Sequence, residues 1–181
     1  MRARLLWVTA LAVMAAGCGE GRLIFNIDVF SFLHTANADS LPYRGPILLF
    51  PDTIPVQSVQ SLGIGSSSIV DTVRFTGTVN FVNDSGTGTV QFALYFDSVA
   101  SNVYNTTPAF SVSGTVTPGQ PTPVPFDIPD IQTALKPLFL RSSMYVGIKA
   151  VATPTAPSTV VRGTAILTAL QARIVITDKI F

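Results

Sequence analysis

The chain has 181 residues, of which 12% are charged and 48% hydrophobic, and its formal net charge is +1 at pH 7. The few cations form no basic run or patch, which argues against nucleic acid as a partner. The single cysteine, Cys18, excludes an internal disulfide framework and any metal cluster built from cysteines.

The first 17 residues have the layout of an export signal. Arg2 and Arg4 form a short basic start, and residues 5–16 are apolar except for Thr9. A run of about a dozen apolar residues suits the hydrophobic region of a signal peptide and is too short to span a bilayer core of about 30 Å. The sequence therefore predicts that residues 1–17 are a signal peptide.

The residues around Cys18 resemble the lipobox of bacterial lipoproteins. Small side chains at Ala15, Ala16 and Gly17 precede the cysteine, and Ala15 stands where Leu is usual. The resemblance covers only the start of the chain. It implies cleavage after Gly17, a thioether-linked diacylglycerol on Cys18 and acylation of the new amino terminus. The chain is thus expected to be anchored to the lipid bilayer through acylated Cys18.

Two other interpretations of this start stay open. A plain secretory signal cut near Ala16 would leave Cys18 as a free thiol, and an uncleaved leader would act as a helical anchor. We prefer lipidation because an unpaired cysteine in an exported protein otherwise needs another explanation. The lipidated tether, residues 18–22, is short, so the folded part is expected close to the headgroups. An Asp after the cysteine resembles the inner-membrane retention signal of some enteric bacteria, so Gly19 favours the outer membrane of the cell envelope.

The mature part has the composition of an exported β-protein. Removal of residues 1–17 leaves about 164 residues, which suits one domain. Val, Ile, Thr and Phe are abundant, with Gly and Pro between them, so strands are favoured over helices. The sequence shows no internal repeat and no hinge, and residues 23–181 are predicted to form a single domain.

Alternation of apolar and polar residues predicts strands along the first half of the chain. Residues 22–30 have one apolar face, formed by Leu23, Phe25, Ile27 and Val29. Residues 45–50 predict a short buried strand and residues 54–62 a weaker one. The strongest pattern spans residues 68–97, where the turn segment NDSGTG separates two alternating runs, and it predicts a long antiparallel hairpin.

Proline marks two boundaries in the second half. Residues 108–118 predict another strand, and the four prolines within residues 119–129 exclude a central sheet position for that segment. Residues 130–136 form the one predicted helix, with Asp130 as its cap and Pro137 as its end.

Residues 143–152 and 160–178 predict the closing strands. Eight or nine strands in total, with Gly and Pro at the corners, predict an all-β fold. We expect an antiparallel two-sheet sandwich, immunoglobulin-like or jelly-roll, with one short helix.

Few side chains favour catalysis. His34 is the only histidine, and a Ser-His-Asp arrangement would need it, with Asp28 or Asp39 to orient the ring. No GxSxG segment supplies a nucleophile, so His34 is predicted to be a loop or surface residue. A transition-metal site would need more His or Cys than the chain has.

Calcium is a second possibility that the pattern does not favour. Asp127 and Asp130 flank a turn, but no DxDxD segment supplies the six to eight oxygens that calcium takes, and helix capping explains Asp130 better. We predict no catalytic residue, no metal site and no cofactor.

Binding residues are equally sparse. Trp7, the only tryptophan, leaves with the signal peptide. Tyr95 is considered as a ligand contact, with packing on the sheet surface as the preferred account. Asn83 and Asn105 match the glycosylation acceptor pattern and are expected to be turn residues.

The sequence thus predicts a lipid-anchored envelope lipoprotein whose β-sandwich is a non-enzymatic binding or structural module, with an envelope protein or glycan as partner. One alternative is an envelope hydrolase that uses Asp carboxylates, since Glu20 is the only glutamate and lies in the tether. A weaker one is an integral outer-membrane β-barrel. The terminal Phe181 suggests it, but Arg173 and Lys179 would then face lipid.

Overall fold

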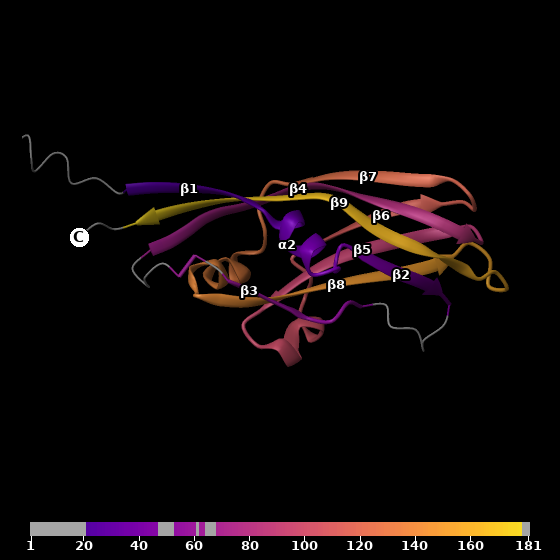
Figure 1. Ribbon diagram of the computed structural model, residues 1–181, viewed down its shortest axis with the longest axis horizontal. Helices are drawn as coiled ribbons and strands as arrows, with labels where there is room; N and C mark the ends of the chain where they lie inside the picture. Colours follow the sequence, from indigo (N-terminus) through magenta and orange to yellow (C-terminus); the bar gives the residue numbers. More distant parts are fainter. Residues whose placement is uncertain (1–20, 47–52, 61, 64–67, 179–181) are drawn as a thin grey trace, which may run out of the picture.

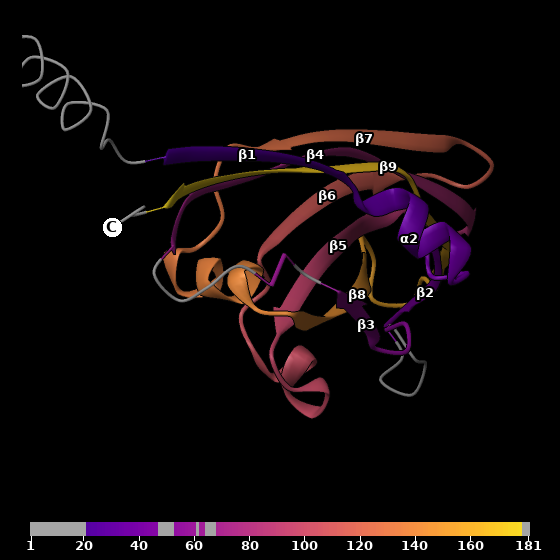
Figure 2. The same cartoon turned by 60° about the vertical axis from the view of Figure 1, so that its left-hand side comes forward.

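The computed structural model describes residues 21–46, 53–60, 62–63 and 68–178. Cys18, the predicted leader and most of the predicted tether lie outside these residues. The described residues form two antiparallel sheets that face each other (Figure 1). Figure 2 shows the two layers from the side, with β1, β4, β7 and β9 in one and β5, β6 and β8 in the other.

The strands divide between a sheet of five and a sheet of four. Sheet A has the order β1 (Gly21–Asp28), β9 (Val161–Asp178), β4 (Ser68–Ser85) and β7 (Pro121–Ile128), and β2 (Ser40–Gly45) also pairs with β9. Sheet B has the order β3 (Gln57–Gln60), β8 (Ser143–Pro154), β5 (Gly88–Asp97) and β6 (Phe110–Val116). This arrangement confirms the predicted all-β sandwich, and within the described residues neither sheet closes on itself.

The first predicted strand is shorter than expected at its end, because a helix follows at once. β1 ends at Asp28, and α2 (Val29–Thr35) begins at the next residue. The Asp28 carboxylate caps α2: it accepts hydrogen bonds from the Ser31 amide (3.3 Å) and hydroxyl (2.6 Å). These bonds satisfy an amide that a helix start leaves free.

β1 and β2 lie one after the other along the same edge of β9. β1 pairs with residues 171–178 of β9, and β2 pairs with residues 161–166. α2 spans the change from one strand to the other, and the Leu167 amide donates to the Asp39 carbonyl between them (2.7 Å). β2 was not predicted, and most of the strand predicted at residues 45–50 lies outside the described residues.

The hairpin predicted over residues 68–97 is wrong in its pairing, although both strands exist. β4 pairs with β7 and β9 in sheet A, whereas β5 pairs with β6 and β8 in sheet B. The short connection between β4 and β5 therefore passes from sheet A to sheet B. Alternation shows which side chains of a strand are buried, but it does not show which strand lies beside it.

Asn83 organises this crossing. Its side chain is 1% exposed, donates to the Gly86 carbonyl (2.6 Å) and accepts from the Tyr43 hydroxyl (3.3 Å). Gly86 has a φ of +72°, a conformation that favours glycine. Asn83 is thus a buried residue at the turn, which agrees with the expectation that its glycosylation pattern is incidental.

The proline-rich segment forms an edge strand, as predicted. Of the described strands, β4 alone pairs with β7, and Pro121, Pro123 and Pro125 all lie in β7. An edge strand needs hydrogen bonds on one side only, so it tolerates residues that lack an amide hydrogen.

The predicted helix at residues 130–136 is displaced. The helical segment is η2 (Thr133–Leu140), a 3-10 helix that contains Pro137. A second 3-10 helix, η1 (Ala100–Asn105), links β5 to β6. Asp130 does not cap η2: its Oδ1 accepts from the Val73 amide (2.9 Å) and its Oδ2 from the Lys136 ammonium (2.5 Å). The carboxylate instead fastens the segment after β7 to the free edge of β4.

The core lies between the inner faces of the two sheets and is centred on aromatic rings. Phe75 of β4 stacks on Phe96 of β5 with 5.7 Å between ring centroids and also contacts Phe110 (5.5 Å) and Phe139 (6.4 Å). All four side chains are buried. Because the inner face of sheet A is fixed by this packing, its outer face is a firm support for polar side chains.

Candidate functional site

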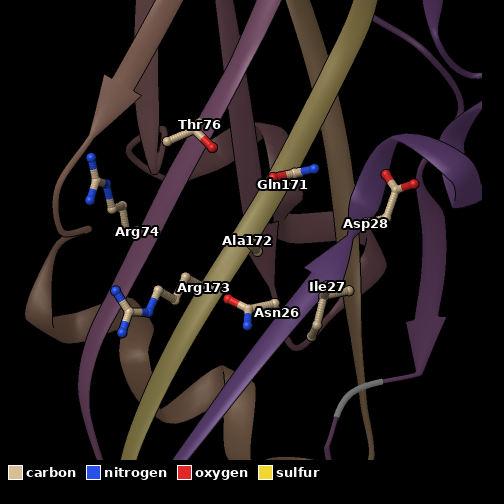
Figure 3. A pocket seen from close by; sticks show the side chains of 8 residues that line it. All are labelled: Asn26, Ile27, Asp28, Arg74, Thr76, Gln171, Ala172 and Arg173. Atoms are coloured by element: carbon tan, nitrogen blue, oxygen red, sulfur yellow. The ribbon is translucent and has the colours of Figure 1, made fainter.

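A shallow hollow of about 460 Å³ lies on the outer face of sheet A (Figure 3). It crosses the three adjacent strands β1, β9 and β4. The residues that line it are Asn26, Ile27, Asp28, Arg74, Thr76, Gln171, Ala172 and Arg173.

Strand register explains why polar side chains meet here. Arg173 of β9 is paired with Asn26 of β1 on one side and with Arg74 of β4 on the other. In the next row of the same face, Gln171 lies between Asp28 and Thr76. Side chains two residues apart on a strand share a face, so the two rows form one polar surface.

Arg74 is held in place by a carboxylate of the edge strand. Its Nε donates to Asp127 Oδ1 (2.7 Å), and a second guanidinium nitrogen contacts the other oxygen of Asp127. This two-point contact raises the pKa of Arg74 and lowers the pKa of Asp127. The two hydrogen bonds to Asp127 fix the orientation of the Arg74 guanidinium at one side of the hollow.

Arg173 is the open cation of the hollow. The structure gives it no ion-pair partner among the described residues. It is exposed, and it is paired across the strands with a second arginine, Arg74, an arrangement of like charges that costs free energy when nothing compensates it. Figure 3 shows both guanidinium groups on the same side of β9.

Asp28 lies at the other end of the hollow and already has partners. The hydrogen bonds from the Ser31 hydroxyl and amide lower its pKa, so it stays ionised as the cap of α2. Besides the Arg74 guanidinium, which Asp127 holds, the hollow offers the Arg173 guanidinium as a donor, and the amides of Asn26 and Gln171 and the Thr76 hydroxyl, which donate and accept. Such a surface fits a ligand rich in acceptor oxygens.

His34 is on the surface, as predicted, but it lies in α2 and not in a loop. Its Nδ1 is 2.7 Å from Asp39 Oδ2, and its side chain is 68% exposed. Its ring stacks on Phe30. Of the two carboxylates considered as partners, Asp39 is the one in contact, whereas Asp28 caps the helix.

The carboxylates considered for calcium each face a cation. Asp127 is paired with Arg74 and Asp130 with Lys136. Burial raises the pKa of Asp130, but the hydrogen bonds from Lys136 and from the Val73 amide outweigh it and the pKa is lowered. No cluster of three potential metal-ligating acids, histidines or cysteines occurs among the described residues.

Tyr95 packs on the surface of sheet B. Its ring meets Tyr104 edge to face with 5.6 Å between centroids, and the Tyr104 hydroxyl donates to the Ile54 carbonyl (2.6 Å). Asn105 ends η1, and its side chain donates to the Ser101 carbonyl (3.2 Å). Both placements agree with the structural roles preferred from the sequence.

Sequence reasoning missed the polar hollow. The signal was present in part, because Arg74 and Thr76 alternate with buried residues, as do Gln171 and Arg173. The sequence did not reveal the strand order, which brings these pairs together. Of the helices that the structure describes, none has the length and apolar character needed to cross a membrane.

Comparison with known proteins identifies no family. No protein family matches the chain, and no curated protein does. A solved structure of infectious bursal disease virus, Gt strain, is similar to this protein at 11% identity and a TM-score of 0.41. The match covers 88% of this protein and 38% of the viral chain.

Two further solved structures resemble the chain at a similar level. A carbohydrate-binding module, CBM28, specific for non-crystalline cellulose has 10% identity and a TM-score of 0.38 over 82% of this chain and 71% of its own. An aminopeptidase from a marine sediment archaeon, Thaumarchaeota archaeon, has 10% identity and a TM-score of 0.42 over 87% of this chain and 33% of its own. The description of this protein as a β-sandwich module therefore rests on its own two sheets.

Proposed function

We propose that the mature protein is a lipid-anchored envelope lipoprotein whose sandwich is a non-enzymatic binding module. The ligand is a glycan that carries carboxylate groups, bound across the outer face of sheet A. One observation carries the ligand assignment: Arg173 presents a guanidinium without an ion-pair partner, among the described residues, beside the fixed guanidinium of Arg74.

A carboxylated sugar matches this surface in two ways. Its carboxylate accepts two parallel hydrogen bonds from a guanidinium, the strongest polar contact that a surface arginine makes. Its hydroxyl groups match the amides of Asn26 and Gln171, which both donate and accept. A hollow open along three strands also accommodates a chain of sugars better than a compact ligand.

A binding role fits the carboxylates of Asp28, Asp127 and Asp130 better than hydrolysis does. Glycoside hydrolysis needs one carboxylic acid whose pKa is raised, so that it carries a proton near neutral pH. The structure lowers the pKa of Asp28, Asp127 and Asp130. Carboxylates that stay ionised and paired serve structure and orientation.

The binding proposal is tested with the mature chain, residues 18–181, expressed without its leader and carrying Cys18→Ser, so that neither the leader nor the anchor calls for detergent. Calorimetric titration should show binding to acidic oligosaccharides such as oligogalacturonate and much weaker binding to neutral ones of equal length. Arg173→Gln should weaken binding about tenfold. The matched control is Arg162→Gln on the same strand, whose guanidinium is 4.0 Å from Asp84 and outside the hollow. Equal losses in both variants would assign the effect to net charge and refute the site.

The anchor is the second part of the proposal. β1 begins at Gly21, three residues after Cys18, so the tether reaches about 10 Å at most and keeps the sandwich at the membrane surface. One acyl chain gives marginal attachment, whereas the two or three implied by the lipobox hold the protein permanently. Labelled palmitate should be incorporated by the wild type and not by Cys18→Ser. Labelling that persists in the variant would overturn the anchor, and outer-membrane residence is tested by density-gradient separation of the two membranes.

A further inference from the structure

A second, apolar cavity lies inside the sandwich, on the opposite side of sheet A from the polar hollow. It has a volume of about 260 Å³ and is enclosed by β1 and β9 above, by β3, β5 and β8 below, and by α2 and η2 at its ends. Among the described residues that line it, Gln60 alone is polar. An apolar cavity of this kind stays dry, so its natural occupant is apolar.

The cavity exists because the two sheets are unequal at this edge. β3, the edge strand of sheet B, has only four residues. On the facing sheet, Ala172 of β9 presents a methyl group where its neighbours Leu170 and Ile174 present larger side chains. A short strand and a small residue together leave space that the core does not fill.

Phe32 of α2 marks the entrance. Its side chain is 57% exposed, unusually high for a phenylalanine beside an apolar interior. Phe32, Val59 and Gln60 line both the cavity and an outer groove of about 510 Å³ between α2 and β3. The groove and the cavity therefore adjoin at these three residues.

The groove differs from the cavity in its chemistry. It adds the polar side chains of Gln57 and Ser58, and no charged residue is among the described residues that line either space. Gln57 Nε2 donates to the Pro55 carbonyl (2.8 Å), so its Oε1 can accept from a ligand hydroxyl. The groove suits an uncharged head with hydroxyl groups.

We propose that this cavity binds an amphiphile with one hydrocarbon chain and a neutral, hydroxyl-bearing head. The cavity exceeds the roughly 150 Å³ of an engineered cavity that takes benzene and is smaller than the roughly 300–1,000 Å³ of sites for drug-sized ligands, so it accommodates one medium-length chain. The chain lies among Ala172, Phe96 and Val146, and the head lies in the groove beside Gln57 and Gln60. This inference does not rest on the lipid anchor or on the ligand proposed for the polar hollow, with which the cavity shares only Ile27 and Ala172 among the described lining residues.

The test uses the same leaderless Cys18→Ser chain, residues 18–181, and the fluorescent apolar probe N-phenyl-1-naphthylamine. Monodecanoylglycerol below its micellar concentration should displace the probe, and decanoate, with the same chain and a charged head, should do so about tenfold less well. Ala172→Leu fills the cavity and should weaken displacement by about tenfold or more. Ala169→Leu makes the same change at an exposed position of β9 and should leave it unchanged.

Each other result would overturn the proposal. Equal binding in the two variants, or loss in both, would show that the probe binds elsewhere. Stronger competition by decanoate would refute the neutral head. If the cavity is open, Ala172→Leu should melt no lower than the wild type, whereas Ala165→Leu in the packed core of the same strand should melt lower. An Ala172→Leu variant that melts as low as Ala165→Leu, or does not fold, would show that the space is not available.

Discussion

Lys136 is expected to be the most consequential charged residue for the stability of the sandwich. Its side chain is 11% exposed, and its ammonium donates to the Asp71 carbonyl (2.5 Å) and to Asp130 Oδ2 (2.5 Å). Asp71 lies at the register shift of β4, between Val70 and Thr72, where the regular pairing with β9 is interrupted. Lys136 thus supplies a hydrogen bond that the strand ladder cannot.

Lys136→Met keeps the apolar stem and removes the cation, so the change isolates the polar contacts. The hydrogen bond from a charged donor to the Asp71 carbonyl is worth about 1.5–3 kcal/mol. The contact with Asp130 adds less, about 0.2–1 kcal/mol, because that carboxylate is 42% exposed and water can replace its partner. We therefore expect the free energy of unfolding to fall by about 2–3 kcal/mol, the larger part coming from the carbonyl.

Urea denaturation followed by far-UV circular dichroism measures the change in the free energy of unfolding. Arg141→Met is the control, because Arg141 is an exposed cation just after the same 3-10 helix. A double-mutant cycle with Asp130→Asn separates the two contacts, and its coupling free energy should stay below about 1 kcal/mol. A loss in Lys136→Met no greater than in Arg141→Met would refute the role of the carbonyl contact. A coupling free energy larger than the loss measured for Lys136→Met alone would show that the Asp71 carbonyl does not account for the larger part of the loss.

The pKa of Asp130 gives an independent check on this network. Because its folded pKa is lowered, its stabilisation is fully present above its unfolded pKa of about 3.9 and is lost as pH falls through the folded value. The wild type should lose stability in acid more steeply than Asp130→Asn. Parallel pH profiles for the two proteins would show that the carboxylate is not stabilised by folding.

Three further predictions concern the buried crossing between the sheets. Burial, with a smaller contribution from Asp84, raises the pKa of Tyr43 to about 12. The free energy of unfolding of the wild type should therefore decrease between about pH 10 and 12. Tyr43→Phe should lack this decrease in alkaline denaturation, and identical curves for the two proteins would contradict the prediction. Gly86→Ala should lower the melting temperature, because a Cβ would lie 2.4 Å from the Val160 carbonyl oxygen at a φ of +72°; an unchanged value would contradict it. Asn83→Ala should cost about 1–3 kcal/mol in urea denaturation by leaving its partners unsatisfied, and a loss below 0.5 kcal/mol would count against that role.

The sequence was sufficient to predict where most strands lie, but it was insufficient to predict which strands pair with one another. Alternation located β4 and β5, and their buried faces agree with it except at Ile69, which is 51% exposed while Val70 is buried. Their assignment to one hairpin failed because only two residues, Gly86 and Thr87, separate them. A link of two residues also suits a hairpin, and only the packing against β8 and β9 decides between the two.

The candidate sites depended on the same missing information. Arg74 and Arg173 alternate with buried residues of their own strands, but their meeting requires β9 to lie beside β4, about a hundred residues earlier in the chain. Phe32 was missed for a local reason: Asp28 ends β1 and caps α2, although the preceding alternation continued through Val29. A cap that interrupts an alternating run is weak evidence in the sequence and decisive in the structure.

The position of β9 has a consequence for how the protein matures. The last strand of the chain occupies an interior position of sheet A, between β4 and the two strands β1 and β2. A chain synthesised from its amino terminus therefore holds β1, β2 and β4 without their shared neighbour until residues 161–178 follow. Assembly of sheet A requires residues 161–178, and pairing between segments so distant in sequence makes it slow. Until β9 is available, the edges of β1, β2 and β4 that pair with it stay open, so a truncation within residues 161–178 is expected to prevent sheet A from forming.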